Sequence, residues 1–102
     1  MFVSIIQLIA NPTAFDQKRV LVMGYAVLKF ESQHIYLSET DAKHGITKNS
    51  LWLDVSDRHY AERARFDQRY VLVEGTFNAR RRGHLGLSSG ALENIGRLEP
   101  LD

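Results

Sequence analysis

The amino-acid sequence predicts a mainly β domain, a five-stranded barrel that spans residues 1–102 as a single unit. Several stretches alternate apolar and polar residues, as strands with one buried face do. The first stretch, residues 18–30, is longer than an average strand and carries Gly24 in its middle, where a bend lets one strand serve two sheets. A capped, amphipathic segment separates the third stretch from the fourth. With 102 residues, of which 44% are hydrophobic and 25% charged, the chain has room for one modest core.

The N-terminal segment predicts a helix rather than a strand. The apolar residues of 3–10 follow helical spacing, and Asn11-Pro12 then supplies a stop. Because the segment is nearly all apolar, we expect a short and largely buried helix. Residues 11–18 are expected to form a connecting turn anchored by Phe15.

Three strands are expected next. In residues 18–30 the side chains of Val20, Val22, Ala26 and Leu28 share one face, which we expect to be the buried one. Residues 34–37 form a shorter alternating run, and 38–48 a loop or one helical turn with a break at Gly45. Residues 50–55 alternate again and predict the third strand.

The second half of the chain predicts a helix and two further strands. Ser56 can cap a helix over residues 57–66, with Tyr60 and Ala64 in its apolar stripe. Residues 70–79 predict the fourth strand, and the tip 80–83 leads into 84–87, so these two stretches are expected to form a hairpin. The tail 88–98 fits either a continued bent strand or a short helical turn.

The order of three strands, a helix and two strands is the plan of an OB-type Greek-key barrel. The strings KRVLVMGYA, YVLVEGTF and GHLGLSSGALENI resemble bacterial OB-type domains. The combination SIIQLIANP, HGITKNSLWLD and VEGTFNARRRGHLGL resembles a group of short bacterial proteins without an assigned activity. The resemblance implies a barrel with an N-terminal helix and a helix between strands three and four, and it implies no site residues.

Composition narrows the classes of function. The formal net charge is +1, whereas a dedicated nucleic-acid binder usually shows a stronger basic excess. The chain has no cysteine, which excludes disulfides and thiolate zinc sites. Its apolar runs are shorter than a membrane span and no signal peptide is evident, so we expect a cytoplasmic protein without a membrane partner.

Three aromatic residues are the first candidate binding surface. If the aliphatic faces point inward, Tyr25, Tyr36 and Trp52 point outward together on strands one to three. The ligand face of many OB barrels lies over strands two and three, where exposed rings stack on bases or sugars. The alternative is that the apolar N-terminal helix covers these rings.

Basic residues are the second candidate. Arg80, Arg81 and Arg82 lie together at the expected tip between strands four and five, and Lys48 lies between strands two and three. Adjacent arginines can contact phosphates without sequence preference. A turn tip is also where charges are most easily solvated, and this simpler interpretation is the favoured one.

No pattern of catalytic or metal-ligating residues is evident. The four histidines lack the spacing of a metal site, and no nucleophile, base and orienting group are placed together, so neither a cofactor nor an enzyme is predicted. The leading hypothesis is a binding module for single-stranded nucleic acid or another extended polymer. The alternative is a protein-interaction or assembly domain, which allows a homo-oligomer.

Overall fold

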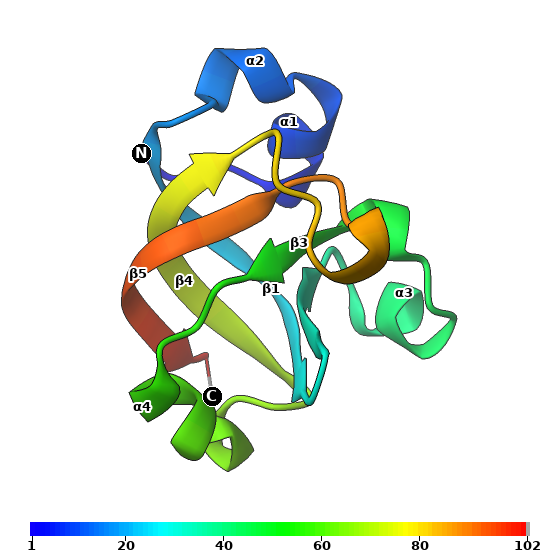
Figure 1. The fold of residues 1–102 in the computed structure, drawn as a ribbon, viewed down its shortest axis with the longest axis vertical. Coiled ribbons are helices and arrows are strands. Elements are labelled where there is room, and N and C mark those ends of the chain that lie inside the picture. Colours follow the sequence, from blue (N-terminus) through cyan, green and yellow to red (C-terminus); the bar gives the residue numbers. More distant parts are fainter. Residues whose placement is uncertain (102) are drawn as a thin grey trace.

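The computed structural model describes residues 1–101 and contains five strands joined in one sheet (Figure 1). Their hydrogen-bonded order is β1-β2-β3-β5-β4, and the sheet closes into a barrel because β1 also pairs with β4. The prediction of a mainly β fold with five strands is confirmed. The strands are β1 (Arg19–Lys29), β2 (Ser32–Tyr36), β3 (Ser50–Leu53), β4 (Arg69–Asn78) and β5 (Ala91–Pro100).

The long strand β1 serves two neighbours, as its length predicts. It pairs antiparallel with β4 from Arg19 to Ala26 and antiparallel with β2 from Tyr25 to Lys29. Gly24 lies just before the change of partner. A Cβ on Gly24 would lie 2.7 Å from Ile35 Cγ1, so the absence of a side chain lets the two strands approach closely there.

Three further strand pairings complete the sheet. The short β3 pairs antiparallel with β2 and parallel with β5, the latter through Trp52 opposite Ala91 and Leu53 opposite Leu92. Strands β4 and β5 pair antiparallel along most of their length, with a shift of register between Glu74 and Thr76. Such a shift bends the strand and increases its twist, which helps a short sheet to curl.

The core lies inside the sheet and follows the predicted alternation. Burial of alternate residues removes apolar surface from water and is the main favourable contribution to folding. The strand residues predicted to face inward are buried, and Ile5 and Leu8 of the N-terminal helix join them. The strand members of the core are Val20, Val22, Ala26, Leu28, Ile35, Leu51, Leu53, Val71, Val73, Phe77, Leu92 and Leu98.

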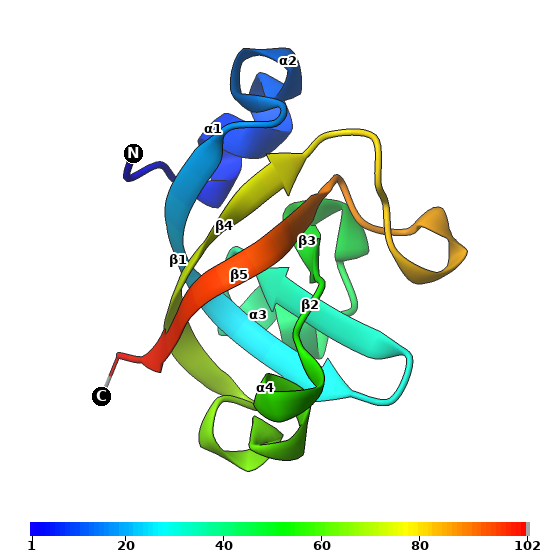
Figure 2. The same ribbon diagram turned by 60° about the vertical axis from the view of Figure 1, so that its left-hand side comes forward.

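Short helices lie around the sheet. Helices α1 (Ile5–Ala10) and α2 (Pro12–Phe15) lie at one end, and α4 (Asp57–Ala61) lies at the other (Figures 1 and 2). Helix α3 (Glu39–Lys43) contacts β1 and β2. Single turns of 3-10 helix are η1 (Thr47–Asn49), η2 (Arg63–Arg65) and η3 (His84–Gly86). No helix within residues 1–101 has the length and apolar character needed to cross a membrane.

The N-terminal helix is shorter than the sequence suggests. Ser4 caps α1, accepting a hydrogen bond from the Gln7 backbone while the Gln7 side chain accepts one from Ser4 N–H. The prediction that Pro12 stops the first helix holds, but Pro12 also starts α2, because proline suits the first turn of a helix. Residues 12–15 are therefore helical rather than a plain turn.

The helix between β3 and β4 starts where predicted, but a different residue from the one expected packs in the core. The Ser56 side chain accepts a hydrogen bond from His59 N–H, as expected of a cap. The α-helix ends at Ala61 and continues as η2, so Ala64 is exposed. The expected apolar contact of Ala64 is wrong, and Phe66, with 1% of its surface exposed, supplies the buried anchor instead.

The predicted fifth strand over residues 84–87 is wrong. This segment contains η3, and Gly83, Leu85 and Gly86 all have positive φ, which a strand does not accommodate. Strand β5 begins only at Ala91, so the tail adopts the bent-strand alternative. The connection between β4 and β5 is consequently a long loop rather than a tight hairpin.

Candidate functional site

The main candidate site is an open groove of about 440 Å³ beside Trp52. Its walls come from the turn after β1, from β2 and β3, and from the β4–β5 connection. In Figure 2 the β1–β2 turn and the β4–β5 connection project toward the same side of the barrel. We call this site the Trp52 groove; its residues are Phe30, Glu31, Gln33, Trp52, Arg81, Arg82, Gly83 and His84.

Trp52 packs against two neighbours. On β2 the His34 ring meets the indole edge to face, with centroids 5.5 Å apart and planes at 89°. The β4–β5 connection also places Gly83 against the ring, and a Cβ on Gly83 would lie 2.6 Å from Trp52 Cε3. The ring is half-buried, so it is oriented by packing while part of it remains available to a ligand.

Phe30 also lines the Trp52 groove and is 80% exposed. It ends the apolar pattern of β1, and the following Glu31 has a positive φ of 59°, which turns the chain toward β2. Across the groove, His84 Nε2 lies 3.7 Å from Glu31 Oε2. The two loops that border the groove therefore contact each other at their tips.

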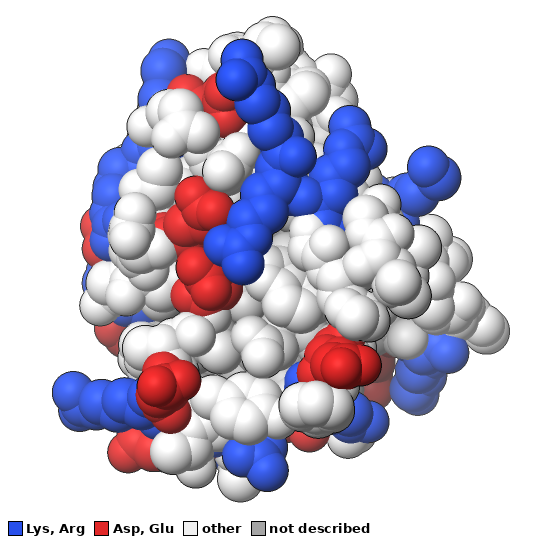
Figure 3. All heavy atoms as spheres, in the orientation of Figure 1, with Lys and Arg blue, Asp and Glu red and all other residues white. Residues whose placement is uncertain are grey.

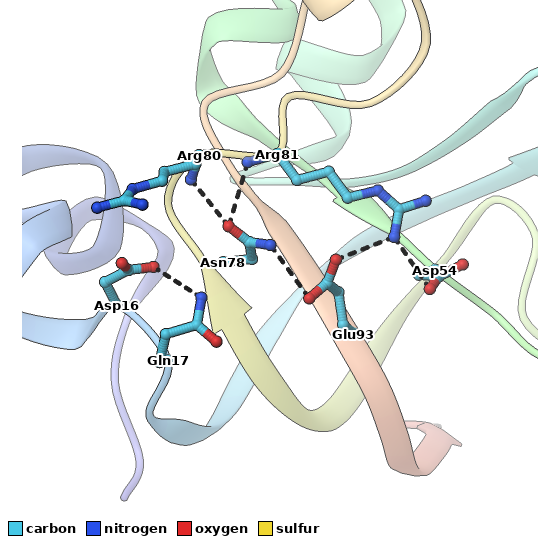
Figure 4. Close-up of polar contacts among 7 residues, drawn as sticks. All are labelled: Asp16, Gln17, Asp54, Asn78, Arg80, Arg81 and Glu93. Atoms are coloured by element: carbon cyan, nitrogen blue, oxygen red, sulfur yellow. Dashed lines mark hydrogen bonds and ion pairs between the residues drawn. The ribbon is translucent and has the colours of Figure 1, made fainter.

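Arg81 is engaged in a salt-bridge network. Its Nη1 lies 3.0 Å from Glu93 Oε2 and 3.0 Å from Asp54 Oδ2 (Figure 4). The hydrogen bond to Glu93, with a smaller effect from Asp54, raises the pKa of the Arg81 guanidinium above its ordinary value. The positive charge of this guanidinium is already compensated by two carboxylates, which would repel a ligand phosphate.

The start of the β4–β5 connection is fixed by short hydrogen bonds. Asn78 Oδ1 accepts from the backbone N–H groups of Arg80 at 3.0 Å and Arg81 at 3.3 Å. Asn78 also donates to Glu93, and Asp16 Oδ1 accepts from Ala79 N–H at 2.8 Å. These contacts determine the direction in which each arginine leaves the backbone.

The three predicted arginines do not act as one cluster. The side chains of Arg80 and Arg81 leave the backbone in opposite directions (Figure 4). Arg82 is exposed and lines the Trp52 groove, whereas Arg80 is exposed and is not part of its lining. The structure thus brings Arg82 to the groove as a potential phosphate contact and separates Arg80 from it.

Tyr25 and Tyr36 do not form an open platform with Trp52. They are 8% and 5% exposed, so neither ring offers a face for stacking in this conformation. Tyr25 meets Tyr70 edge to face, with centroids 5.2 Å apart, and the Tyr70 hydroxyl accepts a hydrogen bond from Glu39 N–H in α3. Burial raises the pKa of both hydroxyls above the ordinary tyrosine value.

The alternative expected from the sequence, a cover supplied by the N-terminal helix, also needs correction. Helix α1 inserts Ile5 and Leu8 into the core at the end of the barrel. The surroundings of Tyr25 include Glu39 and Lys43 of α3, together with Gln68. Residues 38–48 are mostly polar, so their sequence does not predict that α3 packs beside β1 and β2.

Lys48 lies outside the Trp52 groove. It is exposed in η1, and its carbonyl accepts a hydrogen bond from Ser89 Oγ at 2.6 Å. The backbone contact ties η1 to the β4–β5 connection and leaves the ammonium group in solvent. Lys48 therefore remains a candidate only for a ligand long enough to extend beyond the groove.

Sequence reasoning missed a buried polar cluster behind Trp52. His34 Nδ1 lies 3.1 Å from Ser88 Oγ and 3.5 Å from Ser50 Oγ, and the Ser50 hydroxyl donates to the Thr47 carbonyl at 2.6 Å. Burial lowers the pKa of His34 below the ordinary value. The cluster joins β2 and β3 to the β4–β5 connection, and its members are too far apart in the sequence for a local pattern to reveal it.

The remaining charged side chains do not form a uniform surface. Basic and acidic groups are interspersed over the face seen in Figure 3. Among residues 1–101, no group of three or more His, Cys, Asp or Glu side chains is arranged to hold a metal ion. The chemistry available to the Trp52 groove is therefore ring stacking with a few polar contacts.

Comparison of the chain with known protein families, curated proteins and solved structures found no match.

Proposed function

We propose that this protein is an OB-type barrel that binds single-stranded nucleic acid in the Trp52 groove. The observation that carries the proposal is the position of the groove over β2 and β3, between the β1–β2 and β4–β5 connections. In OB barrels the same strands and loops bind oligonucleotides and oligosaccharides. The strand order and the helix between β3 and β4 also fit that plan.

The residues of the groove suit unpaired bases. Phe30 and Trp52 both line the groove with aromatic side chains, and bases stack on such rings without sequence preference. Arg82 adds a cation beside them that can contact a phosphate. A base held in a duplex cannot reach either ring, which favours single strands.

Titration of labelled single-stranded oligonucleotides tests the proposal. Trp52 is the only tryptophan in the sequence, so its fluorescence should change on binding. Trp52→Ala should weaken binding by about 1–3 kcal/mol, and Trp52→Phe should restore part of it because a ring remains. Phe2→Ala is a matched control, since Phe2 is 64% exposed and outside the groove.

The two variants also separate a specific site from nonspecific attraction. Equal binding by wild type, Trp52→Ala and Phe2→Ala would contradict a site at Trp52. Absence of binding at low salt, where electrostatic attraction is strongest, would reject single-stranded nucleic acid as the ligand.

A second function, assembly with another protein chain, is favoured by a different surface. A cavity of about 340 Å³ near the N-terminus has no charged side chain in its lining, and Phe2, Met23 and Leu37 in its lining are exposed. Exposed apolar patches commonly mark protein-interaction sites. A stable oligomer in light scattering that dissociates on Met23→Lys, without any oligonucleotide binding, would favour assembly over the first proposal.

A further inference from the structure

The charge balance around the Trp52 groove restricts how a strand can bind there. Arg81 and Arg82 are the two arginines in the lining, and Glu31 adds a carboxylate. Arg81 is bridged at 3.0 Å to both Asp54 and Glu93, so its charge is already compensated. A phosphate that approached Arg81 would also meet these two carboxylates.

Arg82 is therefore the one cation of the lining that we assign to phosphate contact. It is exposed, and no ion pair involves it among residues 1–101. Arg80 leaves the chain on the side opposite to Arg81 and does not line the groove (Figure 4). The three adjacent arginines of the sequence thus reduce to a single contact at this site.

The Trp52 groove offers more aromatic contacts than uncompensated positive charges. Phe30 is 80% exposed, and Trp52 is fixed in orientation by His34 and Gly83. A ring held in place loses little conformational freedom when a base stacks on it. Two aromatic residues in the lining, Phe30 and Trp52, give two stacking positions, one for each of two bases.

We infer that the Trp52 groove recognises a short single-stranded segment by stacking two bases on Phe30 and Trp52, with one phosphate contact, at Arg82. This inference rests on the proposed function and specifies its mode. Bases supply the affinity, and the backbone charge contributes little. Binding is accordingly far less sensitive to salt than the sequence ARRRG suggests.

The first test compares two ligands of equal charge. One is an oligothymidine of about eight nucleotides, and the other is an abasic strand of the same length. Removal of the bases should weaken binding by about tenfold or more, because the stacking contacts disappear. Equal affinity for both strands would overturn the inference and would show that phosphates dominate.

The second test measures salt dependence. For single strands the logarithm of the binding constant changes with the logarithm of salt concentration with a slope of about −0.7 per phosphate contacted. One contact predicts a slope near −0.7 for the wild type, and three contacts would give about −2. A slope of about −2 or steeper would overturn the single-contact mode while leaving nucleic-acid binding itself established.

Two matched variants test whether Arg82 makes the phosphate contact. Arg82→Ala should bring the slope close to zero, whereas Arg80→Ala should leave it unchanged, although both remove one exposed arginine from the same loop. Circular dichroism should show that both variants remain folded. Equal effects of the two substitutions would overturn the assignment to Arg82, and no binding by the wild type at low salt would instead reject the proposed function.

Discussion

Gly83 lies directly against the indole of Trp52, so close that a Cβ on Gly83 would approach Cε3 within 2.6 Å. The contact joins the β4–β5 connection to β3 across the wall of the groove. Gly83 also has a φ of +71°, a conformation that other residues adopt at a cost. The close packing of the loop on the ring thus requires the absence of a side chain at position 83.

Gly83→Ala should destabilise the protein and shift the fluorescence of Trp52. The backbone of Gly83, with φ 71° and ψ −161°, lies in a region essentially restricted to glycine and costs another residue about 1–3 kcal/mol, and the clash with the ring adds about 1–3 kcal/mol. Gly86→Ala is the matched control, because Gly86 has a φ of +65° and no atom near its Cβ position. Urea unfolding and emission spectra check the difference, and equal losses with unchanged emission would contradict it.

Arg81→Gln should lower the free energy of unfolding by about 1 kcal/mol, because Asp54 and Glu93 would lose their shared cation. The effect is modest since the Arg81 side chain is 40% exposed. It should shrink at high salt, which screens the remaining carboxylates. Arg97→Gln, which removes an exposed arginine paired with Glu99 on the same strand, should produce no measurable change.

A double-mutant cycle with Glu93→Gln separates the network from the loss of a side chain. If the ion pairs stabilise the loop, Arg81→Gln should cost less in the Glu93→Gln background than in the wild type. Additive effects of the two substitutions would show that Arg81 and Glu93 are not coupled.

Stability should fall as the pH drops below about 6.5, partly because of His34. Its pKa is lowered in the folded state by burial, so the unfolded chain binds the proton more readily. Neutral His34 therefore makes its full contribution to the free energy of unfolding at pH values above the pKa of His34 in the unfolded chain. This contribution is lost as the pH falls toward the lower pKa of His34 in the folded protein. Unfolding free energies measured between about pH 7.5 and pH 5 would reveal the slope.

His34→Asn isolates that contribution. Asparagine keeps a polar group near Ser88 but does not titrate in this range, so the variant should show a smaller loss of stability on acidification. His44→Asn removes an exposed histidine and serves as the control. An identical pH profile for wild type and His34→Asn would contradict a role for His34.

The strands could be predicted because their information is local. Alternation with a period of two identifies the buried faces of residues 18–30 and 50–55, and Ser56 marks a helix start by its own chemistry. The burial of Val20, Leu51 and Val73 follows directly from such patterns.

The groove depends on contacts between distant residues, which no local pattern reports. The charge of Arg81 is compensated by Asp54, which follows β3, and by Glu93 of β5, and Tyr25 is enclosed by Tyr70 and by α3. The false fifth strand has a related cause, since the alternation in HLGL is too short to outweigh three glycines with positive φ at 83, 86 and 90.

The same substitution at two phenylalanines distinguishes an effect on stability from an effect on binding. Phe66 is 1% exposed and packs in the core, so Phe66→Ala should lower the free energy of unfolding by about 3–5 kcal/mol. Phe30 is 80% exposed, so Phe30→Ala should change it by less than about 0.5 kcal/mol. Phe30→Ala should nevertheless weaken oligonucleotide binding by about 1–3 kcal/mol, because one stacking wall of the groove is lost. Urea unfolding and fluorescence titration of the same preparations distinguish the two roles. A strong loss of stability in Phe30→Ala would show that its ring packs against the barrel, and unchanged binding would remove it from the site.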